Sequence, residues 1–242
     1  MFILRKLART SAVLLVIVFF GVTLGCSETQ SQTETSQTAS TTEKTSQAAW
    51  NFDDVPEGEL PAGWIVEATN QDGPPATWKI VRDATAPSGH QVLALVSPPG
   101  KYGRNFNLCW TDSISLLDGE IRVEFKSSTG EVDQGGGVMW RVQDKDNYYI
   151  ARFNPLEDNF RIYYVHNGSR HKIADARIVL PAGEWHTMKI IQKGAKYEGY
   201  INGEKLLEGT NDLFTNPGGV GLWTKADAVT SFDDFSVNPL KP

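Results

Sequence analysis

The central stretch of the chain, residues 135–164, alternates hydrophobic and polar positions with a period of two, which is typical of β-strands. Three runs, 138–143, 148–154 and 159–165, are separated by the polar segments DKDN and NPLEDN, which are typical of turns. Short polar connections of this kind favour an antiparallel meander. One face of each strand is apolar while the other mixes cations, amides and tyrosines. We therefore predict a sheet that is buried on one side and open to a ligand on the other.

The rest of the chain from Trp50 onward repeats this alternation in short runs, such as IRVEFKS, WHTMKIIQ and GLWTK, separated by Gly, Pro, Asn and Asp. The dipeptide Asn202-Gly203 predicts a type I′ hairpin turn. No segment keeps an apolar helical face for three turns. About thirteen or fourteen short strands at regular spacing predict one all-β domain, an antiparallel β-sandwich of the jelly-roll type. We expect its first and last strands, around NFDD and SFDDFSV, to pair with each other.

The first 49 residues have a different composition. Three cations, Arg5, Lys6 and Arg9, precede an apolar run over 12–24 that is too short to span a bilayer comfortably, which predicts a secretory signal peptide over 1–25. Residues 27–48 are mainly Ser, Thr and Gln and are expected to form a disordered linker. The predicted organisation is therefore a signal peptide (1–25), Cys26 with the linker (26–49) and a β-sandwich (50–242).

Charge and cysteine content narrow the possible partners. The formal net charge is −6, and removal of the three leader cations would leave −9 on the mature chain. No basic run is present, so the sequence lacks the electrostatic footprint of a nucleic-acid-binding protein. Cys109 is the only cysteine besides Cys26 and lies in the strand-like segment FNLCW. We expect Cys109 to be a small buried hydrophobic residue.

The segment Val22-Thr23-Leu24-Gly25-Cys26-Ser27 resembles the lipobox of bacterial lipoproteins. This resemblance implies that Cys26 becomes the diacylated N-terminus and that the domain lies outside the cytoplasm, held to the cell envelope by its lipid anchor only. Because Ser27 follows the cysteine, the resemblance also implies the outer membrane if the host is Gram-negative. Cleavage by ordinary signal peptidase is the alternative.

Several strings, EWHTMKI, GLWTKAD, FDDFSV and the whole of 135–164, resemble the concanavalin A-like lectin/glucanase superfamily, which includes laminin G-like modules. They are most similar to bacterial domains described as family-16-glycoside-hydrolase-like or 3-keto-disaccharide-hydrolase-like. The resemblance covers most of residues 50–238 and implies a jelly-roll fold. It does not imply a reaction, because this superfamily contains binding modules, enzymes and adhesion domains.

Catalytic acids are not evident in the sequence. Glucanases of glycoside hydrolase family 16 carry the motif E-x-D-x-x-E on one strand, and a retaining glycosidase needs two closely spaced carboxylates. The nearest string here, 131–136, has Glu131 and Asp133 but lacks the last Glu and lies in a glycine-rich segment. This departure argues against family-16 chemistry. The other paired acids, which are expected to be solvated turn residues, are Asp144, Asp146, Glu157 and Asp158.

Metal-binding patterns are also weak. The four histidines are scattered, with no pair spaced for zinc. We expect no cofactor. Calcium bound by oxygen ligands of the DKDN turn or the Asp-Asp pairs is the alternative.

Six residues are predicted to share the polar face of the sheet: Arg141, Tyr148, Arg152, Asn154, Trp223 and Lys225. Aromatic planes combined with amides and cations are typical of carbohydrate recognition. Arg152 is expected to matter most, since a guanidinium can hold a carboxylate or two vicinal hydroxyls. In the alternative interpretation Trp223 belongs to the core and the arginines pair with Glu157 or Asp158. A slip of one residue would exchange the two faces.

Three hypotheses for function follow from these patterns. The first is a lipid-anchored, extracytoplasmic domain that binds a carbohydrate or another partner without catalysis. The second, implied by the family resemblance, is a glycosidase-like hydrolase or lyase that acts on a modified disaccharide. The third is a structural module of the envelope. The sequence leaves the sugar, the oligomeric state and the host type open.

Overall fold

The computed structural model describes residues 47–71, 73–98 and 104–240, which lie in one compact unit, Thr42–Pro242. The predicted signal peptide, Cys26 and most of the linker fall outside the described residues. All regular elements in the described part are strands, so the all-β prediction is confirmed. The described residues contain no helix that is long and apolar enough to cross a membrane.

Eight of the described strands form the first sheet, called sheet A, in the order β13-β12-β11-β6-β15-β4-β3, with β1 added beside β15. Their bounds are β1 (Ala48–Trp50), β3 (Thr77–Arg82), β4 (Gln91–Ser97), β6 (Gly119–Thr129), β11 (His186–Lys193), β12 (Lys196–Ile201), β13 (Glu204–Thr210) and β15 (Val229–Pro239). Trp50 of β1 lies opposite Phe235 of β15, so the first and last strands pair as predicted, although β1 ends before NFDD, which forms a turn.

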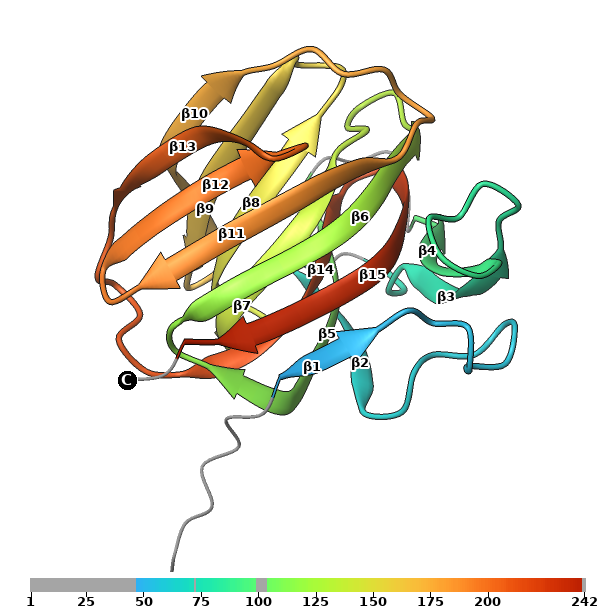
Figure 1. Cartoon of the computed structure of the whole chain (residues 1–242), viewed down its shortest axis with the longest axis horizontal. Helices are drawn as coiled ribbons and strands as arrows, with labels where there is room; N and C mark the ends of the chain where they lie inside the picture. Colours follow the sequence, from blue (N-terminus) through green and yellow to red (C-terminus); the bar gives the residue numbers. More distant parts are fainter. Residues whose placement is uncertain (1–46, 72, 99–103, 241–242) are drawn as a thin grey trace, which may run out of the picture. The chain divides into compact units, whose positions relative to one another are not determined.

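Seven described strands form the second sheet, called sheet B, in the order β10-β9-β8-β7-β14-β5-β2. Their bounds are β2 (Trp64–Thr69), β5 (Phe106–Leu116), β7 (Gly136–Asp144), β8 (Asn147–Asn154), β9 (Asn159–His166), β10 (Ser169–Arg177) and β14 (Gly218–Lys225). All strand pairs in both sheets are antiparallel. The two sheets lie face to face, as the predicted jelly-roll sandwich requires (Figure 1).

Turn chemistry sets the register of the hairpins in both sheets. Asn202 and Gly203 have positive φ angles of 50° and 83° and connect β12 to β13, which confirms the predicted hairpin. Asn167 and Gly168, with φ angles of 49° and 75°, connect β9 to β10 in the same way. Strands β7, β8 and β9 are consecutive neighbours in sheet B, so the predicted meander is also confirmed.

The core lies between the inner faces of the two sheets. On β8 and β9 the inward positions are the ones that the alternation predicts: Tyr149, Ala151, Phe153, Phe160 and Ile162. The indole of Trp140 stacks on the ring of Tyr149 at 5.4 Å between centroids and donates from Nε1 to Gln192 of sheet A. Cys109 is fully buried among the core side chains, and burial raises the pKa of its thiol. It therefore packs as the small hydrophobic residue that the sequence predicts.

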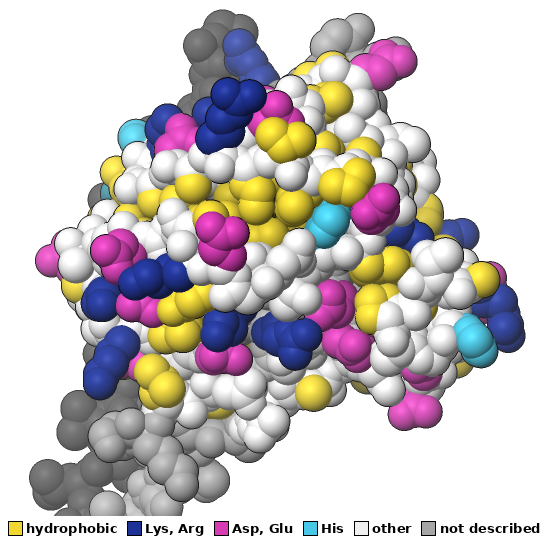
Figure 2. All heavy atoms as spheres, turned by 45° about the horizontal axis from the view of Figure 1, so that its top comes forward, with side chains coloured by type: hydrophobic (Ala, Val, Ile, Leu, Met, Phe, Trp, Pro, Cys, Tyr) yellow, Lys and Arg dark blue, Asp and Glu magenta, His cyan; other side chains and the backbone are white. Residues whose placement is uncertain are grey.

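The edge strands β10 and β13 lie next to each other at one side of the sandwich. Half-buried hydrophobic residues from both strands, among them Ile173, Ala176 and Leu206, pack against the core there. Figure 2, with the top of Figure 1 turned forward, shows hydrophobic side chains gathered between rows of basic and acidic ones. Apolar side chains therefore contribute to closing this side of the sandwich, where no ladder joins the two sheets.

The outer face of sheet B is not open along its whole length, contrary to our expectation. A second cluster of buried hydrophobic residues lies on this face: Phe106, Leu108, Trp110, Met139, Val142, Tyr148, Ile150, Val165 and Trp223. The alternation correctly places Tyr148 and Trp223 on the face away from the core. What it does not reveal is that neighbouring side chains of the same face bury them.

Arg141 departs from the alternation because β7 contains a bulge. Its φ angle is 47°, and the register of β7 against both neighbouring strands shifts around it. The bulge moves Val142 to the outer cluster and directs Arg141 to the end of the sandwich. There its guanidinium donates to the carbonyl oxygens of Leu117, Phe214 and Gly194 and to Asp118. The prediction that Arg141 shares a face with the other five residues is therefore wrong.

Candidate functional site

The five remaining predicted residues lie on the outer face of sheet B. Tyr148, Arg152 and Asn154 come from β8, whereas Trp223 and Lys225 come from β14, and β7 separates the two strands. Four of them are at most 1 % exposed, and the side chain of Lys225 is 19 % exposed. The structure thus brings the five residues to one face but leaves only Lys225 among them accessible to a ligand.

Arg152 is held by neighbours from the β8–β9 turn and from β9. Its Nη1 donates to Asn159 at 3.1 Å, and its Nη2 donates to Glu157 at 3.0 Å and to the Tyr163 hydroxyl at 3.3 Å. The pairing with Glu157 matches the alternative that the sequence leaves open for the arginines. Within the described part of the chain, Nε of Arg152 is buried without a hydrogen-bond partner.

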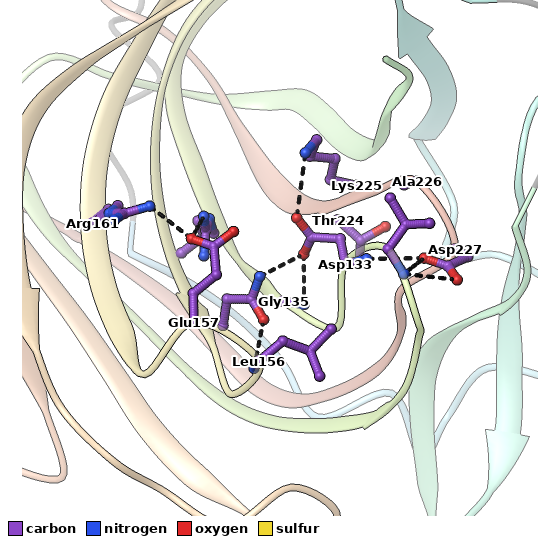
Figure 3. Close-up of polar contacts among 12 residues, drawn as sticks. Asp133, Gly135, Leu156, Glu157, Arg161, Thr224, Lys225, Ala226 and Asp227 are labelled. Atoms are coloured by element: carbon purple, nitrogen blue, oxygen red, sulfur yellow. Dashed lines mark hydrogen bonds and ion pairs between the residues drawn. The ribbon is translucent and has the colours of Figure 1, made fainter. Parts of the chain in front are cut away.

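Glu157 connects two arginines at the end of β8. Its Oε2 also accepts a hydrogen bond from Arg161 at 2.7 Å (Figure 3). Burial alone would raise the pKa of this carboxyl, but the hydrogen bond from Asn159 and the charges of Arg152 and Arg161 outweigh that effect and lower the pKa to about 2. Glu157 is therefore an anion at neutral pH and is poorly suited to act as a proton donor.

Asp133 is a buried carboxylate between β6 and β7, in the segment that was compared with the glucanase motif. Its Oδ1 accepts hydrogen bonds from the Gly135 amide at 2.8 Å and from Asn154 at 3.2 Å, and its Oδ2 lies 3.6 Å from Nζ of Lys225 (Figure 3). Since Glu131 and Asp133 lie in a loop and not on a strand, the structure does not reproduce the strand arrangement of that motif.

The loop that carries Asp133 is fixed from the β14–β15 turn. The carboxylate of Asp227 accepts hydrogen bonds from the backbone amides of Glu131, Val132 and Asp133 at 2.8 to 3.2 Å (Figure 3). Burial raises the pKa of Asp227, but these backbone hydrogen bonds outweigh it, so the pKa lies below its ordinary value. These hydrogen bonds hold the backbone of Asp133 against the turn that follows Lys225.

Glycines allow β7 to approach β8 closely at this end of the sheet. A Cβ atom on Gly135 would lie 2.6 Å from the Phe153 carbonyl oxygen, and one on Gly137 would lie 2.0 Å from the Ala151 carbonyl oxygen. Larger residues would therefore push the strands apart and displace Asp133 from Asn154. The glycines at the start of β7 are thus required for the geometry of the site.

Tyr148 and Trp223 are packed within the outer cluster. The Tyr148 hydroxyl lies 2.7 Å from Oγ1 of Thr69, and burial raises the pKa of this phenol. The Trp223 ring packs against Phe106 at 5.4 Å between centroids. Both aromatic residues therefore pack beneath the accessible side chains of the face. They are too buried to offer a stacking surface to a ligand.

Arg170 of β10 is a residue of this face that the sequence reasoning missed. Its guanidinium carbon lies 4.3 Å from the Tyr163 ring centroid, 5.2 Å from Phe106 and 5.7 Å from Trp223. Among the described residues, Arg170 forms no ion pair, and its Nη1 is buried without a hydrogen-bond partner. Burial lowers the pKa of Arg170, although Tyr163 opposes that change.

A sequence signal for Arg170 does exist. The Asn167-Gly168 turn fixes a two-residue hairpin, so the alternation of β9 continues into β10 with Arg170 opposite Val165. Arg170 must then share the outer face with Tyr163.

The chemistry of this face is defined by partly accessible cations, of which Arg170 lies over aromatic rings. Arg161, Arg170 and Lys225 are partly accessible, and their planar or ammonium donors suit oxygen-rich ligands. Among the described residues, no group of three His, Cys, Asp or Glu side chains is arranged to hold a metal ion.

The fold and the polar face together define a jelly-roll domain of the concanavalin A-like class. The chain belongs to the family of 3-keto-alpha-glucoside-1,2-lyase-like domains, whose model matches residues 46–238. This match confirms the resemblance found in the sequence.

Solved structures show the same fold at low identity. The carbohydrate binding module CBM66 from Bacillus subtilis is 18% identical, with a TM-score of 0.57, over 74% of this chain and 98% of that chain. The Bacillus licheniformis beta-glucanase is 12% identical, with a TM-score of 0.54, over 81% of this chain and 98% of that chain. The cellulose induced protein Cip1 gives a TM-score of 0.54 at 13% identity, also over 81% and 98% of the two chains. No curated protein sequence matched the chain.

Replacing Arg152 by alanine is expected to destabilise the protein by about 2–3 kcal/mol, because Glu157 and Asn159 would lose a buried charged partner. Urea unfolding of the purified protein measures this change. Arg177→Ala is the matched control, since its side chain is 83% exposed, and it should cost less than about 0.5 kcal/mol. Equal unfolding midpoints for the two variants would contradict this role of Arg152.

The lowered pKa of Glu157 predicts a pH dependence of stability. A carboxyl whose pKa is lower in the folded state stabilises the protein above its unfolded pKa of about 4.5, and this contribution is lost as the pH falls towards about 2. Glu157→Gln should therefore be less stable than wild type at pH 7, and the difference should shrink below pH about 4. Thermal unfolding across this pH range is the measurement. A difference in stability that stays constant with pH would contradict the lowered pKa of Glu157.

Proposed function

We propose that this chain is an extracytoplasmic domain that binds carbohydrate on the outer face of sheet B, through Arg170, Arg161 and Lys225. The observation that carries the proposal is the half-buried guanidinium of Arg170, which lies over the ring of Tyr163 and has no ion-pair partner within the described residues. Arg170 is partly exposed, so its guanidinium can donate to an oxygen-rich ligand without first breaking an ion pair within the described residues.

Two comparisons support a sugar as the ligand. The description of the family names a glucoside as the compound acted on, and the similarly folded CBM66 is described as a carbohydrate binding module. Sugars present both hydroxyl oxygens and apolar C–H groups, which suit the cations and the ring edges of this face.

A second candidate function is elimination from a 3-keto glucoside, which the family description favours. In such a step a base removes the proton on C2, next to the carbonyl, the C1–C2 double bond forms, and the C1–O bond to the leaving group breaks. A nearby cation would hold the enolate oxygen. Asp133 beside Lys225 offers these two groups, but its carboxylate is fully buried, so binding is the better supported function.

A glycan array of the purified protein, combined with mass spectrometry of any bound sugar after incubation, separates these functions. Binding without a change in mass supports the carbohydrate-binding domain. Cleavage of a 3-keto glycoside into an unsaturated product and a released sugar supports the lyase. If neither binding nor cleavage is detected, the hypothesis that remains is a structural envelope module.

Arg170→Ala should weaken binding of an array-positive glycan by about tenfold or more. It should also lower the unfolding midpoint moderately, because its contacts with the rings of Tyr163, Phe106 and Trp223 are lost. Isothermal titration calorimetry measures the affinity. Lys205→Ala on β13 of sheet A is the control, since Lys205 is 43% exposed and pairs with Glu208, away from the proposed binding face. The proposal fails if both variants bind like wild type.

We also propose that Cys26 carries a lipid anchor, on the strength of the lipobox-like segment before it. Wild-type protein should then partition into the membrane fraction, and Cys26→Ala should lose the acyl chains and that retention. Fractionation and mass spectrometry of the mature N-terminus provide the test. A soluble wild-type protein that begins at Ser27 or later would contradict the anchor.

A further inference from the structure

A pocket of about 630 Å³ lies beside the β7–β8 turn, at the opposite end of β8 from Asn154. Its lining includes Trp110, three carboxylates and three amides: Glu67, Asp144, Asp146, Gln143, Asn147 and Asn167. The arginine-rich site proposed above consists of Arg161, Arg170 and Lys225. Arg161 lies toward the far end of β9, whereas Arg170 lies on β10, three residues after the pocket residue Asn167. A volume of this size fits a small-molecule ligand.

The two turns that form the pocket are tied to each other. The amide of Asn167 donates to Oδ1 of Asn147 at 3.0 Å, and the amide of Gly168 donates to the Asp146 carbonyl at 3.1 Å. Within the β7–β8 turn, Asp144 accepts hydrogen bonds from the Asp146 amide and from Asn147. The polar groups of the pocket are therefore pre-organised, which lowers the entropic cost of binding.

Trp110 is the aromatic residue of the pocket lining and, at 9% exposed, is the more accessible indole of the outer cluster, since Trp223 is fully buried. Its Nε1 donates to Glu67 at 3.0 Å, which fixes the orientation of the indole. The six-membered ring packs on β14, where a Cβ atom on Gly219 would lie 2.8 Å from Cε3 and Cζ3. An indole held beside carboxylates and amides combines an apolar surface with hydrogen-bonding groups, as sugar sites do.

The pocket carries a net negative charge, whereas the arginine-rich site is formed by cations. Glu67, Asp144 and Asp146 carry three negative charges, against the single positive charge of Lys145, which pairs with Asp146 at 2.6 Å. Carboxylates accept hydrogen bonds from hydroxyl groups but repel an acidic sugar. The pocket therefore suits a ligand that is rich in hydroxyls and has no negative charge.

We propose that this pocket is a second carbohydrate-binding site, specific for one neutral sugar residue. The ring of the sugar lies against Trp110, its hydroxyls donate to Glu67 and Asp144, and the side-chain amide of Asn167 donates to one of its oxygens. The pocket uses a different set of side chains from the arginine-rich site and does not need them to bind its sugar.

Nuclear magnetic resonance of the purified protein tests this site with three probes: methyl α-glucoside, methyl β-galactoside and glucuronic acid. The indole N–H signal of Trp110, assigned with Trp110→Phe, is the readout. At least one neutral glycoside should shift this signal in a saturable manner, whereas glucuronic acid should not. Glu67→Gln keeps an oxygen acceptor for the indole and should weaken the binding about tenfold.

Two further variants sharpen the test. Asn167→Gly removes the amide but tolerates the positive φ angle of 49°, so it should also weaken binding while the fold persists. Glu184→Gln, an exposed position outside the pocket, is the control and should bind like wild type. The proposal is overturned if no neutral glycoside shifts the signal, if glucuronic acid shifts it equally, or if Glu67→Gln binds like the control.

The outcome is independent of the function proposed above. Loss of glycan-array binding in Arg170→Ala without an indole response to the neutral probes would retain the arginine-rich site and reject the pocket. An indole response together with unchanged array binding in Arg170→Ala would retain the pocket and reject the arginine-rich site.

Discussion

The structure of the candidate site depends on the neutralisation of Arg152, a guanidinium that is 1 % exposed on the outer face of sheet B. A charge removed from water must be paired and hydrogen-bonded, and Glu157, Asn159 and Tyr163 provide these contacts. The β8–β9 turn, which contains Glu157, places its carboxylate beside Arg152. The neighbouring end of β8 contacts Asp133 through Asn154, and Asp227 holds the loop that carries Asp133.

The strands, the meander and the hairpins could be predicted because they depend on local information, namely the period of two and the chemistry of turns such as Asn202-Gly203. The position of Arg141 could not be predicted in this way. Its bulge is stabilised by carbonyl groups of Leu117, Phe214 and Gly194, which are distant in sequence. A single inserted residue shifts the alternation, and no local pattern in β7 signals it.

Burial of the outer face could likewise not be predicted from the sequence. The alternation identifies Tyr148 and Trp223 as residues of that face, but their burial depends on Thr69 of β2 and Phe106 of β5. In contrast, Arg170 could have been found by continuing the register through the Asn167-Gly168 turn. The accessible cations of the site therefore differ from the residues that sequence alone favours, although both sets lie on one face.

The central claim is that a carbohydrate binds on the outer face of sheet B. A crystal structure of the protein with the strongest array-positive glycan tests this claim most directly. The account predicts sugar density on that face, with an oxygen atom within hydrogen-bond distance of the Arg170 guanidinium. Sugar bound on the outer face of sheet A, or bound with no contact to sheet B, would contradict it.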